Sequence, residues 1–194
     1  MQTNTKKEVS CKAFDPVFEY AKSNNIHLND LIVGVPYDLS YLLNKHEGVE
    51  WRVWCKIISN SNRFFRRDEY IKMGSDFVKR GAYFEGLLWA FFLFTSSKFS
   101  RFLVKAIFQS GASMFTCMKQ NTEFLGANKV RITAFVAEGY EYCPEFFFLC
   151  IGVWEQLGNQ LGQKNFKVVL NIIEQRGVFD ISWNKESLIF KLKR

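Results

Sequence analysis

Residues able to carry metal or nucleophilic chemistry are few in this 194-residue chain. The two histidines, His27 and His46, each stand beside turn residues, which favours exposure, and no metal-ligand spacing joins either one to a cysteine. There is no glycine-rich phosphate loop, no Gly-x-Ser-x-Gly motif, and no spacing that suggests a serine–histidine–aspartate set. Metal-dependent, phosphate-binding and serine-hydrolase functions are therefore not expected.

Two pairs of carboxylates could in principle supply a catalytic acid and base. They are Asp30 with Asp38 and Glu47 with Glu50. Acidic residues near helix starts usually cap the helix or interact with its dipole, so we expect structural roles for all four. On this inventory the protein is not expected to be an enzyme.

The five cysteines form an odd set without a Cys-x-x-Cys motif: Cys11, Cys55, Cys117, Cys143 and Cys150. The polar N-terminus shows no secretory signal, and together these features favour free thiols in a reducing cytoplasm. Cys143 stands at a predicted helix start, where thiol pKa values fall, so it is the candidate reactive thiol. The alternative, which we favour, is that Cys143 is a small buried hydrophobe.

Composition leaves two questions open. The 21 Phe, 7 Tyr and 5 Trp predict either a very large core or a cavity lined by rings. The net charge of +7 allows nucleic acid or an anionic membrane surface as partner, but the basic residues are dispersed, so a solvated surface is expected.

The longest apolar run, Leu87 to Phe94, has eight residues, far fewer than the ~20 that a membrane span needs.

The elements that must position any site are clearest between Lys129 and Trp183. Alternation of apolar and other residues from Val130 to Val136 predicts a strand. Pro144 opens an apolar helix that runs to about Leu161, and alternation returns from Phe166 to Ile172. A turn at Gln175–Gly177 and a strand ending at Trp183 complete an α+β pattern.

The remaining chain is predicted to be helical before this region and extended after it. Residues 1–13 are polar and expected to be flexible, and residues 14–194 form a single domain. Residues 14–110 are mainly helical and 111–194 contain the sheet, with Met114 to Lys119 as a strand. Leu188 to Leu192 is a fifth strand or a linker. The predicted fold is thus a helical cluster packed on a four- to five-stranded antiparallel sheet, which one apolar helix interrupts.

Two stretches resemble a known group of domains. Gly34-Val35-Pro36-Tyr37-Asp38-Leu39-Ser40-Tyr41-Leu42-Leu43-Asn44, followed by Trp51, is similar to the N-terminal sensory domain of bacterial signalling proteins associated with histidine kinases or nucleotide cyclases. Gly177 to Trp183 resembles the closing hairpin of that group. The element order is similar to the superfamily of haem-nitric-oxide-binding domains, 4-vinyl-reductase-type domains and Golgi transport subunits. The resemblance covers about Phe14 to Trp183.

Departures from this pattern bear on the cofactor. Haem-nitric-oxide domains hold iron through a histidine on a central helix, but Arg67 to Phe108 contains no histidine. They also carry a Tyr-x-Ser-x-Arg strand motif, for which this chain has only Tyr140-Glu141-Tyr142-Cys143-Pro144. Haem held through a histidine is therefore not expected. A thiolate ligand from Cys117 or Cys143 is a minor alternative, and the cofactor stays unknown.

What the resemblance still implies is an apolar pocket between the sheet and the long helices. Its walls would be Phe91, Phe92, Phe94, Phe146, Phe147, Phe148, Cys150 and Trp154. Tyr140, Tyr142 and Arg131 would orient the ligand. Such walls suit a hydrophobic or flat molecule: an acyl chain, an isoprenoid or an aromatic ring.

Three functions follow from these features. The first is a sensory ligand-binding module, expected to be a homodimer that acts on a kinase or cyclase module in cis or in trans. The second is a protein–protein interaction domain whose aromatic residues all fill the core. The third is a nucleic-acid or membrane-surface binder driven by the positive charge. We expect the first, located in the cytoplasm and without nucleic acid as partner.

Overall fold

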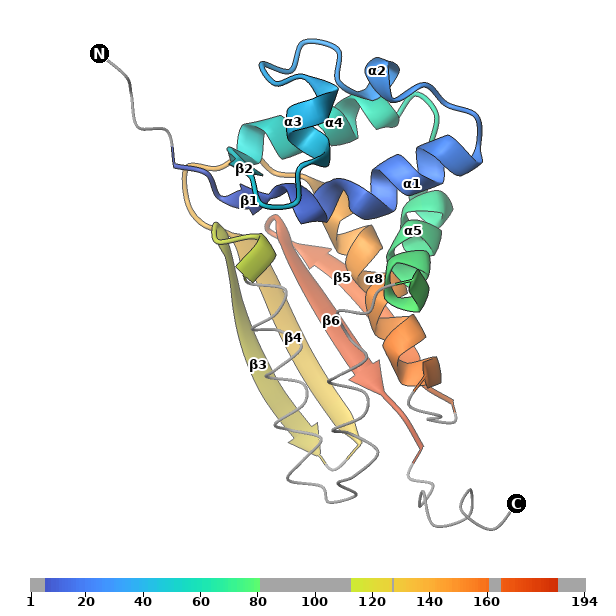
Figure 1. Cartoon of the computed structure of the whole chain (residues 1–194). Coiled ribbons are helices and arrows are strands. Elements are labelled where there is room, and N and C mark those ends of the chain that lie inside the picture. The colour runs from blue at the N-terminus through green and yellow to red at the C-terminus, as the bar shows by residue number, and fades with distance from the viewer. Residues whose placement is uncertain (1–5, 81–112, 127, 161–164, 185–194) are drawn as a thin grey trace.

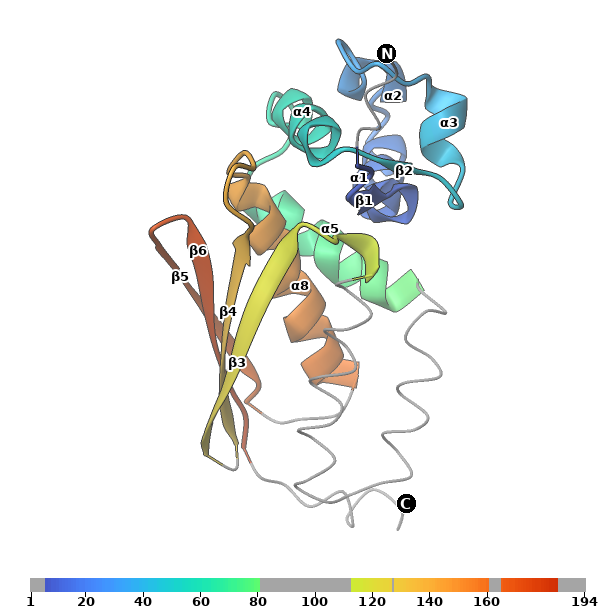
Figure 2. The ribbon, with the colours of Figure 1, turned by 90° about the vertical axis from the view of Figure 1, so that its left-hand side faces the viewer.

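The computed structural model describes residues 6–80, 113–126, 128–160 and 165–184. A cluster of short helices from the first 80 residues sits at one end of a four-stranded antiparallel sheet (Figure 1). Helix α8 lies along one face of the sheet and α5 packs against α8 (Figures 1 and 2). The predicted α+β class, with a helix inserted between strands of the sheet, is confirmed.

The helical cluster consists of short elements in chain order. They are β1 (Val9–Ser10), the 3-10 helix η1 (Cys11–Phe14), α1 (Asp15–Ser23), α2 (Leu28–Leu31), α3 (Leu39–Leu43), β2 (Gly48–Val49), α4 (Trp51–Ser61) and α5 (Arg67–Arg80). Most of the aromatic-rich α4 is buried, with Trp51 and Trp54 each 1% exposed, whereas Arg52, Lys56 and Ser59 form an exposed stripe. Burial of these rings anchors the cluster, because aromatic side chains remove the most apolar area from water.

The segment before Phe14 differs from the expectation of a flexible N-terminus. Val9 pairs with Val49 in an antiparallel two-stranded ribbon, and it forms a further bridge to Phe115. Val9, Cys11 and Ala13 are all buried. The polar composition of residues 1–13 predicts a flexible segment. In the structure, however, the apolar side chains of Val9, Cys11 and Ala13 alternate with polar ones and are buried against residues far along the chain.

The sheet has the strand order β3 (Met118–Gly126), β4 (Lys129–Val136), β6 (Arg176–Ser182), β5 (Lys167–Ile173), and all neighbours are antiparallel. The predicted strand at Met114 was placed too early. Met114 lies in a short helical turn, and β3 begins only at Met118, after the backbone N–H of Thr116 donates to the carbonyl of Glu8. The possible fifth strand at 188–192 and the apolar run at 87–94 lie outside the described residues.

Period-2 alternation decides which sheet residues face α8 (Pro144–Gln160). Val130, Ile132 and Ala134 of β4 are buried, and Ile132 is paired with the buried Phe179 of β6. Phe147 of α8 packs on Phe179 at a ring-centroid distance of 6.2 Å. The other face of the sheet is covered by no described element (Figure 2).

The described helices carry no membrane span. None of those in the described ranges combines the length and apolar character that crossing a bilayer requires.

Candidate functional site

A cavity of about 150 Å³ lies where the helical cluster, α8 and the sheet meet. Its walls are almost entirely carbon and sulfur. They are formed by Ala13, Pro16, Trp54, Phe77, Met114, Phe115, Met118, Lys119, Gln120, Ala134, Phe146, Leu149, Cys150, Val153, Trp154 and Phe179. Six of these residues are aromatic: Trp54, Phe77, Phe115, Phe146, Trp154 and Phe179.

The size of the cavity limits what it holds. A dry apolar cavity of about 150 Å³ accepts benzene, whereas drug-sized ligands occupy roughly 300–1,000 Å³. One aromatic ring or a short aliphatic molecule fits this space. An extended isoprenoid or acyl chain, two of the ligands suggested by the sequence, would have to extend out of this space.

Three of the predicted pocket residues line this cavity: Phe146, Cys150 and Trp154, all on α8. The adjacent Phe147 points instead to the sheet and is completely buried against Phe179. Phe148, which is half-buried, lies beneath the guanidinium of Arg67, whose Cζ is 5.4 Å from the ring centroid. Successive helix residues turn by about 100°, so consecutive phenylalanines cannot share one wall. The predicted residues Phe91, Phe92 and Phe94 lie outside the described residues.

The predicted polar contacts to a ligand lie elsewhere. Arg131 stands between two buried residues of β4 and so occupies the opposite face of the sheet, where its guanidinium donates to both Asp180 carboxylate oxygens at 2.8 and 3.0 Å. The Tyr140 hydroxyl donates to Glu8 Oε1 at 3.0 Å. The Tyr142 ring packs near Phe147, 6.2 Å between centroids. None of these three is among the residues that line the cavity.

The helical cluster and the turn before β3 also contribute to the cavity wall, which the sequence patterns did not predict. Trp54, Phe77 and Phe115 enclose the cavity from that side. Phe77 lies on the apolar stripe of α5. The spacing of that stripe predicts a helix but does not show that Phe77 lines a cavity. The only signal for Trp54 was the aromatic content of α4, because its neighbours in the cavity are distant in the chain.

Trp54 also supplies an unsatisfied polar atom. Its ring stacks on Phe14 at 5.4 Å and meets Phe115 edge-on at 5.1 Å. The indole Nε1 is buried, and among the described residues it has no hydrogen-bond partner. A buried donor without an acceptor costs free energy, roughly 1–3 kcal/mol.

The five cysteines are free thiols, and four of them are buried. A hydrogen bond to Cys55 and burial raise the pKa of Cys143 well above its usual value, so the helix start does not activate it. Burial raises the pKa of Cys117 and of Cys150 to about 12, and that of Cys11 to about 11. The preferred interpretation of Cys143 as a buried hydrophobe agrees with its 4% exposure.

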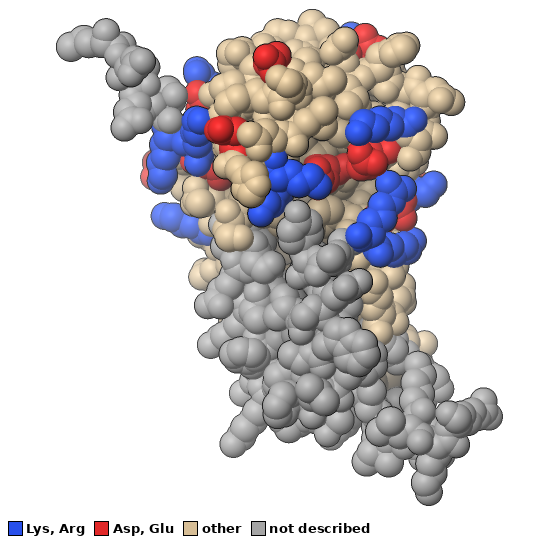
Figure 3. Space-filling model, viewed as in Figure 1, with Lys and Arg blue, Asp and Glu red and all other residues tan. Residues whose placement is uncertain are grey.

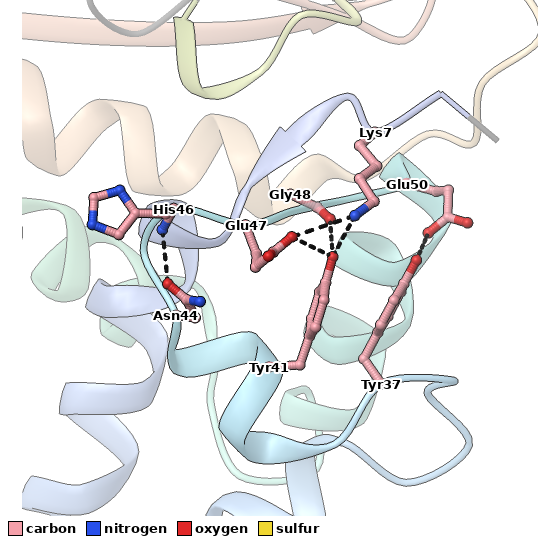
Figure 4. A network of polar contacts seen from close by, with 8 residues as sticks. All are labelled: Lys7, Tyr37, Tyr41, Asn44, His46, Glu47, Gly48 and Glu50. Atoms are coloured by element: carbon pink, nitrogen blue, oxygen red, sulfur yellow. Dashed lines mark hydrogen bonds and ion pairs between the residues drawn. The ribbon is translucent and has the colours of Figure 1, made fainter. Parts of the chain in front are cut away.

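Three of the four candidate carboxylates, Asp38, Glu47 and Glu50, form hydrogen bonds within or beside the sequence motif around Tyr37. Asp38 Oδ1 caps α3 by accepting from the N–H of Tyr41 at 2.8 Å, and this backbone hydrogen bond lowers the Asp38 pKa. Figure 4 shows Tyr37 donating to Glu50 and Tyr41 donating to Glu47, both at 2.9 Å. The two tyrosine rings stack at 4.6 Å. This network fastens the loop to β2 and leaves no pair of free carboxylates there.

A haem in this cavity would need a side chain able to bind its iron. His27 and His46 are exposed on the helical cluster, and neither lines the cavity (Figure 4 shows His46 in the turn before β2). Burial raises the pKa of Cys150, the cysteine in the described cavity wall, to about 12, and the thioethers of Met114 and Met118 would resemble the Met/His ligation of cytochromes c only with a histidine beside them. The residues therefore do not fit a haem. Among the described residues there is also no group of three His, Cys, Asp or Glu able to hold a metal ion.

Surface charges are interspersed rather than segregated. Figure 3 shows Lys and Arg beside Asp and Glu on the described part of one face. Lys45 pairs with Asp15 at 2.6 Å and Lys22 with Glu19 at 2.8 Å. Paired charges of this kind belong to a solvated surface, and they weaken the case for a nucleic-acid or membrane-surface binder on this face.

Solved structures of H-NOX domains share this fold. The unliganded Fe(II) H-NOX protein from K. algicida matches with a TM-score of 0.66 and 11% identity over 92% of this chain and 98% of that chain. A mutant of the same protein gives 0.67 and 12% over 94% and 100%. An oxygen-binding H-NOX domain related to soluble guanylate cyclases gives 0.59 and 7% over 91% and 96%.

No protein-family model and no curated protein matches the chain. At identities of 7–12% the likeness to the solved structures establishes the fold alone. The predicted relation to haem-nitric-oxide-binding domains is confirmed at that level.

Proposed function

We propose that the chain is a sensory domain that binds a small, uncharged hydrophobic molecule in the apolar cavity and passes the signal to a partner. The observation that carries this proposal is the cavity itself, about 150 Å³ with nearly all-apolar walls, in a domain of H-NOX fold. The neighbours sharing the fold are described as H-NOX and oxygen-binding domains, one related to soluble guanylate cyclases. Those names support sensing as the function of this chain.

The position of the cavity gives a route for the signal. Its walls come from the helical cluster (Ala13, Trp54), from α8 (Phe146, Leu149) and from the sheet (Phe179). A molecule that contacts all three parts binds more tightly to one of their arrangements than to another. Such a difference in affinity is what shifts a conformational equilibrium.

The ligand is expected to be a single ring or a short chain, with at most one hydrogen-bond acceptor. An acceptor that reached Trp54 Nε1 would satisfy the unpaired donor. Tyr140 and Arg131 are engaged with Glu8 and Asp180, so they are not proposed as ligand contacts.

The protein that receives the signal is also part of this proposal. We propose that the domain acts as a homodimer in the cytoplasm, on a kinase or cyclase module in cis or in trans, and that it performs no catalysis itself. Nucleic acid is not proposed as a partner.

Binding in the cavity can be observed through the methionine methyl groups. The four methionines include Met114 and Met118 in the cavity wall and Met73, which is fully buried outside it. With ¹³C-methyl methionine, titration of toluene is expected to shift the Met114 and Met118 signals and leave that of Met73 in place. Equal shifts at all three, or no shift, would contradict the proposal.

A cavity-filling variant sharpens this experiment. Cys150→Leu adds carbon into the cavity, so the response of Met114 and Met118 to toluene is expected to be lost. Phe148→Leu alters the same helix away from the cavity and should keep the response. If both variants keep it, the ligand binds somewhere else.

Haem gives a second measurement. Because the described residues of the cavity wall include no imidazole, and burial raises the pKa of their one thiol, Cys150, to about 12, adding hemin to the purified protein is expected to leave the broad spectrum of free hemin, without a sharp Soret band. A histidine-ligated H-NOX protein under the same conditions is the control. A stoichiometric sharp Soret band would show that haem binds and that the proposed ligand class is wrong.

The alternative function is an interaction domain with a filled core. The extensive packing of rings around Trp51, Phe115 and Phe146 favours it, because these centroids lie only 4.9–6.2 Å apart. It would be preferred if toluene gave no methyl shift in the intact protein.

A further inference from the structure

The two edges of the sheet are built differently. Edge strand β3 carries Lys119 and Glu123, and its register with β4 is interrupted between Phe124 and Gly126. Charges and bulges of this kind are how natural sheets prevent pairing with other chains. The opposite edge strand, β5, keeps seven consecutive pairs with β6, has no proline and carries one charge, Lys167.

The unprotected edge is also the more apolar one. Val169, Ile172 and Ile173 of β5 are 38%, 43% and 56% exposed, and they are three of the seven large hydrophobic residues exposed in the described ranges. In those ranges no strand pairs with the outer side of β5, which forms one side of the sheet in Figure 1. A long, regular apolar edge is a template for another strand.

We propose that β5 pairs with β5 of a second copy of this chain, antiparallel, with the two-fold axis at Asn171. This register sets Val169 opposite Ile173 of the other copy on the open face of the sheet. It sets Leu170 opposite Ile172 on the face that α8 covers, and Asn171 opposite itself. All three exposed apolar side chains of β5 then contact an apolar partner on the other copy, and such cross-strand pairs stabilise a sheet.

Charge is compatible with the same register. Lys167 lies beside the Glu174–Gln175 turn of the other copy, where the backbone leaves the strand conformation, and the two Lys167 side chains stand at opposite ends of the paired strands, so like charges do not meet. An axis shifted by one residue to Leu170 would set Lys167 against Ile173 and leave the exposed isoleucine facing an ammonium. Of these two axes, the sequence of β5 favours the one at Asn171.

The resulting assembly joins both sheets into one, with α8 of each copy on the same face. The β5 pairing gives the interface of the homodimer that the proposed function includes. It is inferred from the edge strand and does not depend on the cavity. Two strands and their side chains bury less than the roughly 1,200 Å² of a standard interface, so a weak dimer is expected.

Sedimentation of the intact chain over a range of concentrations tests the pairing. The wild type is expected to show a reversible monomer–dimer equilibrium, and Ile172→Lys to weaken it at least about tenfold by placing an ammonium in the paired edge. Leu125→Lys, at an equally exposed residue of β3, is the matched control and should dimerise as the wild type does. A wild type that stays monomeric, or equal loss in both variants, would overturn the proposal.

Cross-linking tests the register. Under mild oxidation Asn171→Cys is expected to form a disulfide-linked dimer, whereas Val169→Cys, which faces Ile173, should remain largely monomeric. The native cysteines are mostly buried, and the unsubstituted chain corrects for any that react. Cross-linking through Val169→Cys in preference to Asn171→Cys would rule out this register. Because the methyl titration measures the cavity separately, loss of dimerisation with retained toluene binding would contradict the interface and leave the ligand-binding function intact.

Discussion

Replacing Gly152 by alanine is expected to lower the free energy of unfolding by about 1–2 kcal/mol. A Cβ atom at this position would lie 1.8 Å from the carbonyl oxygen of Ile71 on α5, so the two helices would have to separate. Overpacking of this kind costs about 1–3 kcal/mol or more, and the better helix propensity of alanine returns only about 1 kcal/mol. A Cβ atom at Gly74 on α5 would likewise lie 2.0 Å from the carbonyl oxygen of Leu149 on α8. Alanine at position 74 is therefore also expected to lower the free energy of unfolding.

Chemical denaturation of Gly152→Ala and Gly126→Ala would measure this difference. Gly126 is the matched control because a Cβ atom there meets nothing within 4 Å. Gly126→Ala should therefore change stability by less than about 0.5 kcal/mol. Similar stabilities for the two variants would mean that α5 and α8 do not approach each other through their glycines.

The close contact of α5 and α8 bears on function as well as stability. Both helices place a residue in the cavity wall, Phe77 from α5 and Leu149 from α8. Separating the helices would change the volume available to a ligand. We therefore expect Gly152→Ala to weaken the toluene response of Met114 and Met118 even where the domain remains folded.

Those parts of the fold that depend on short-range periodicity were predicted well. Alternation along β4 identified Val130, Ile132 and Ala134 as one face, and all three are buried. Pro144 was placed correctly at the helix start because its fixed φ and missing N–H suit that position. The same alternation puts Arg131 on the outer face, so its assignment to the pocket conflicted with a pattern already recognised.

The site depends on contacts between residues far apart in the chain, which periodicity does not encode. Trp54 and Phe146 line one cavity although 92 positions separate them. The burial of Glu8 and Val9 likewise depends on Tyr140, Val49 and Phe115. A local reading of composition at the N-terminus could not show that its backbone is held by three distant segments.

Replacing Glu8 by alanine is expected to destabilise the domain by about 3 kcal/mol. Glu8 is 6% exposed, its Oε2 accepts from the backbone N–H of Trp51 at 3.1 Å, and its Oε1 accepts from the Tyr140 hydroxyl at 3.0 Å. The N-cap residue of α4, Glu50, makes no side-chain capping hydrogen bond, so Glu8 supplies the negative group at that helix start from 43 positions away. Hydrogen bonds to a charged group contribute about 1.5–3 kcal/mol each, and alanine would leave buried donors unpaired.

A double-mutant cycle separates this linkage from simple loss of packing. Tyr140→Phe removes one of the two side-chain hydrogen bonds and should cost about 1–2 kcal/mol in the wild type but little in the Glu8→Ala background. Glu138→Ala, at an exposed carboxylate near Tyr140, is the control and should be close to neutral. If Tyr140→Phe costs the same in both backgrounds, the hydroxyl does not depend on Glu8. Coupling would instead show that one carboxylate joins the first strand, the start of α4 and the loop before α8, which are the parts that meet around the cavity.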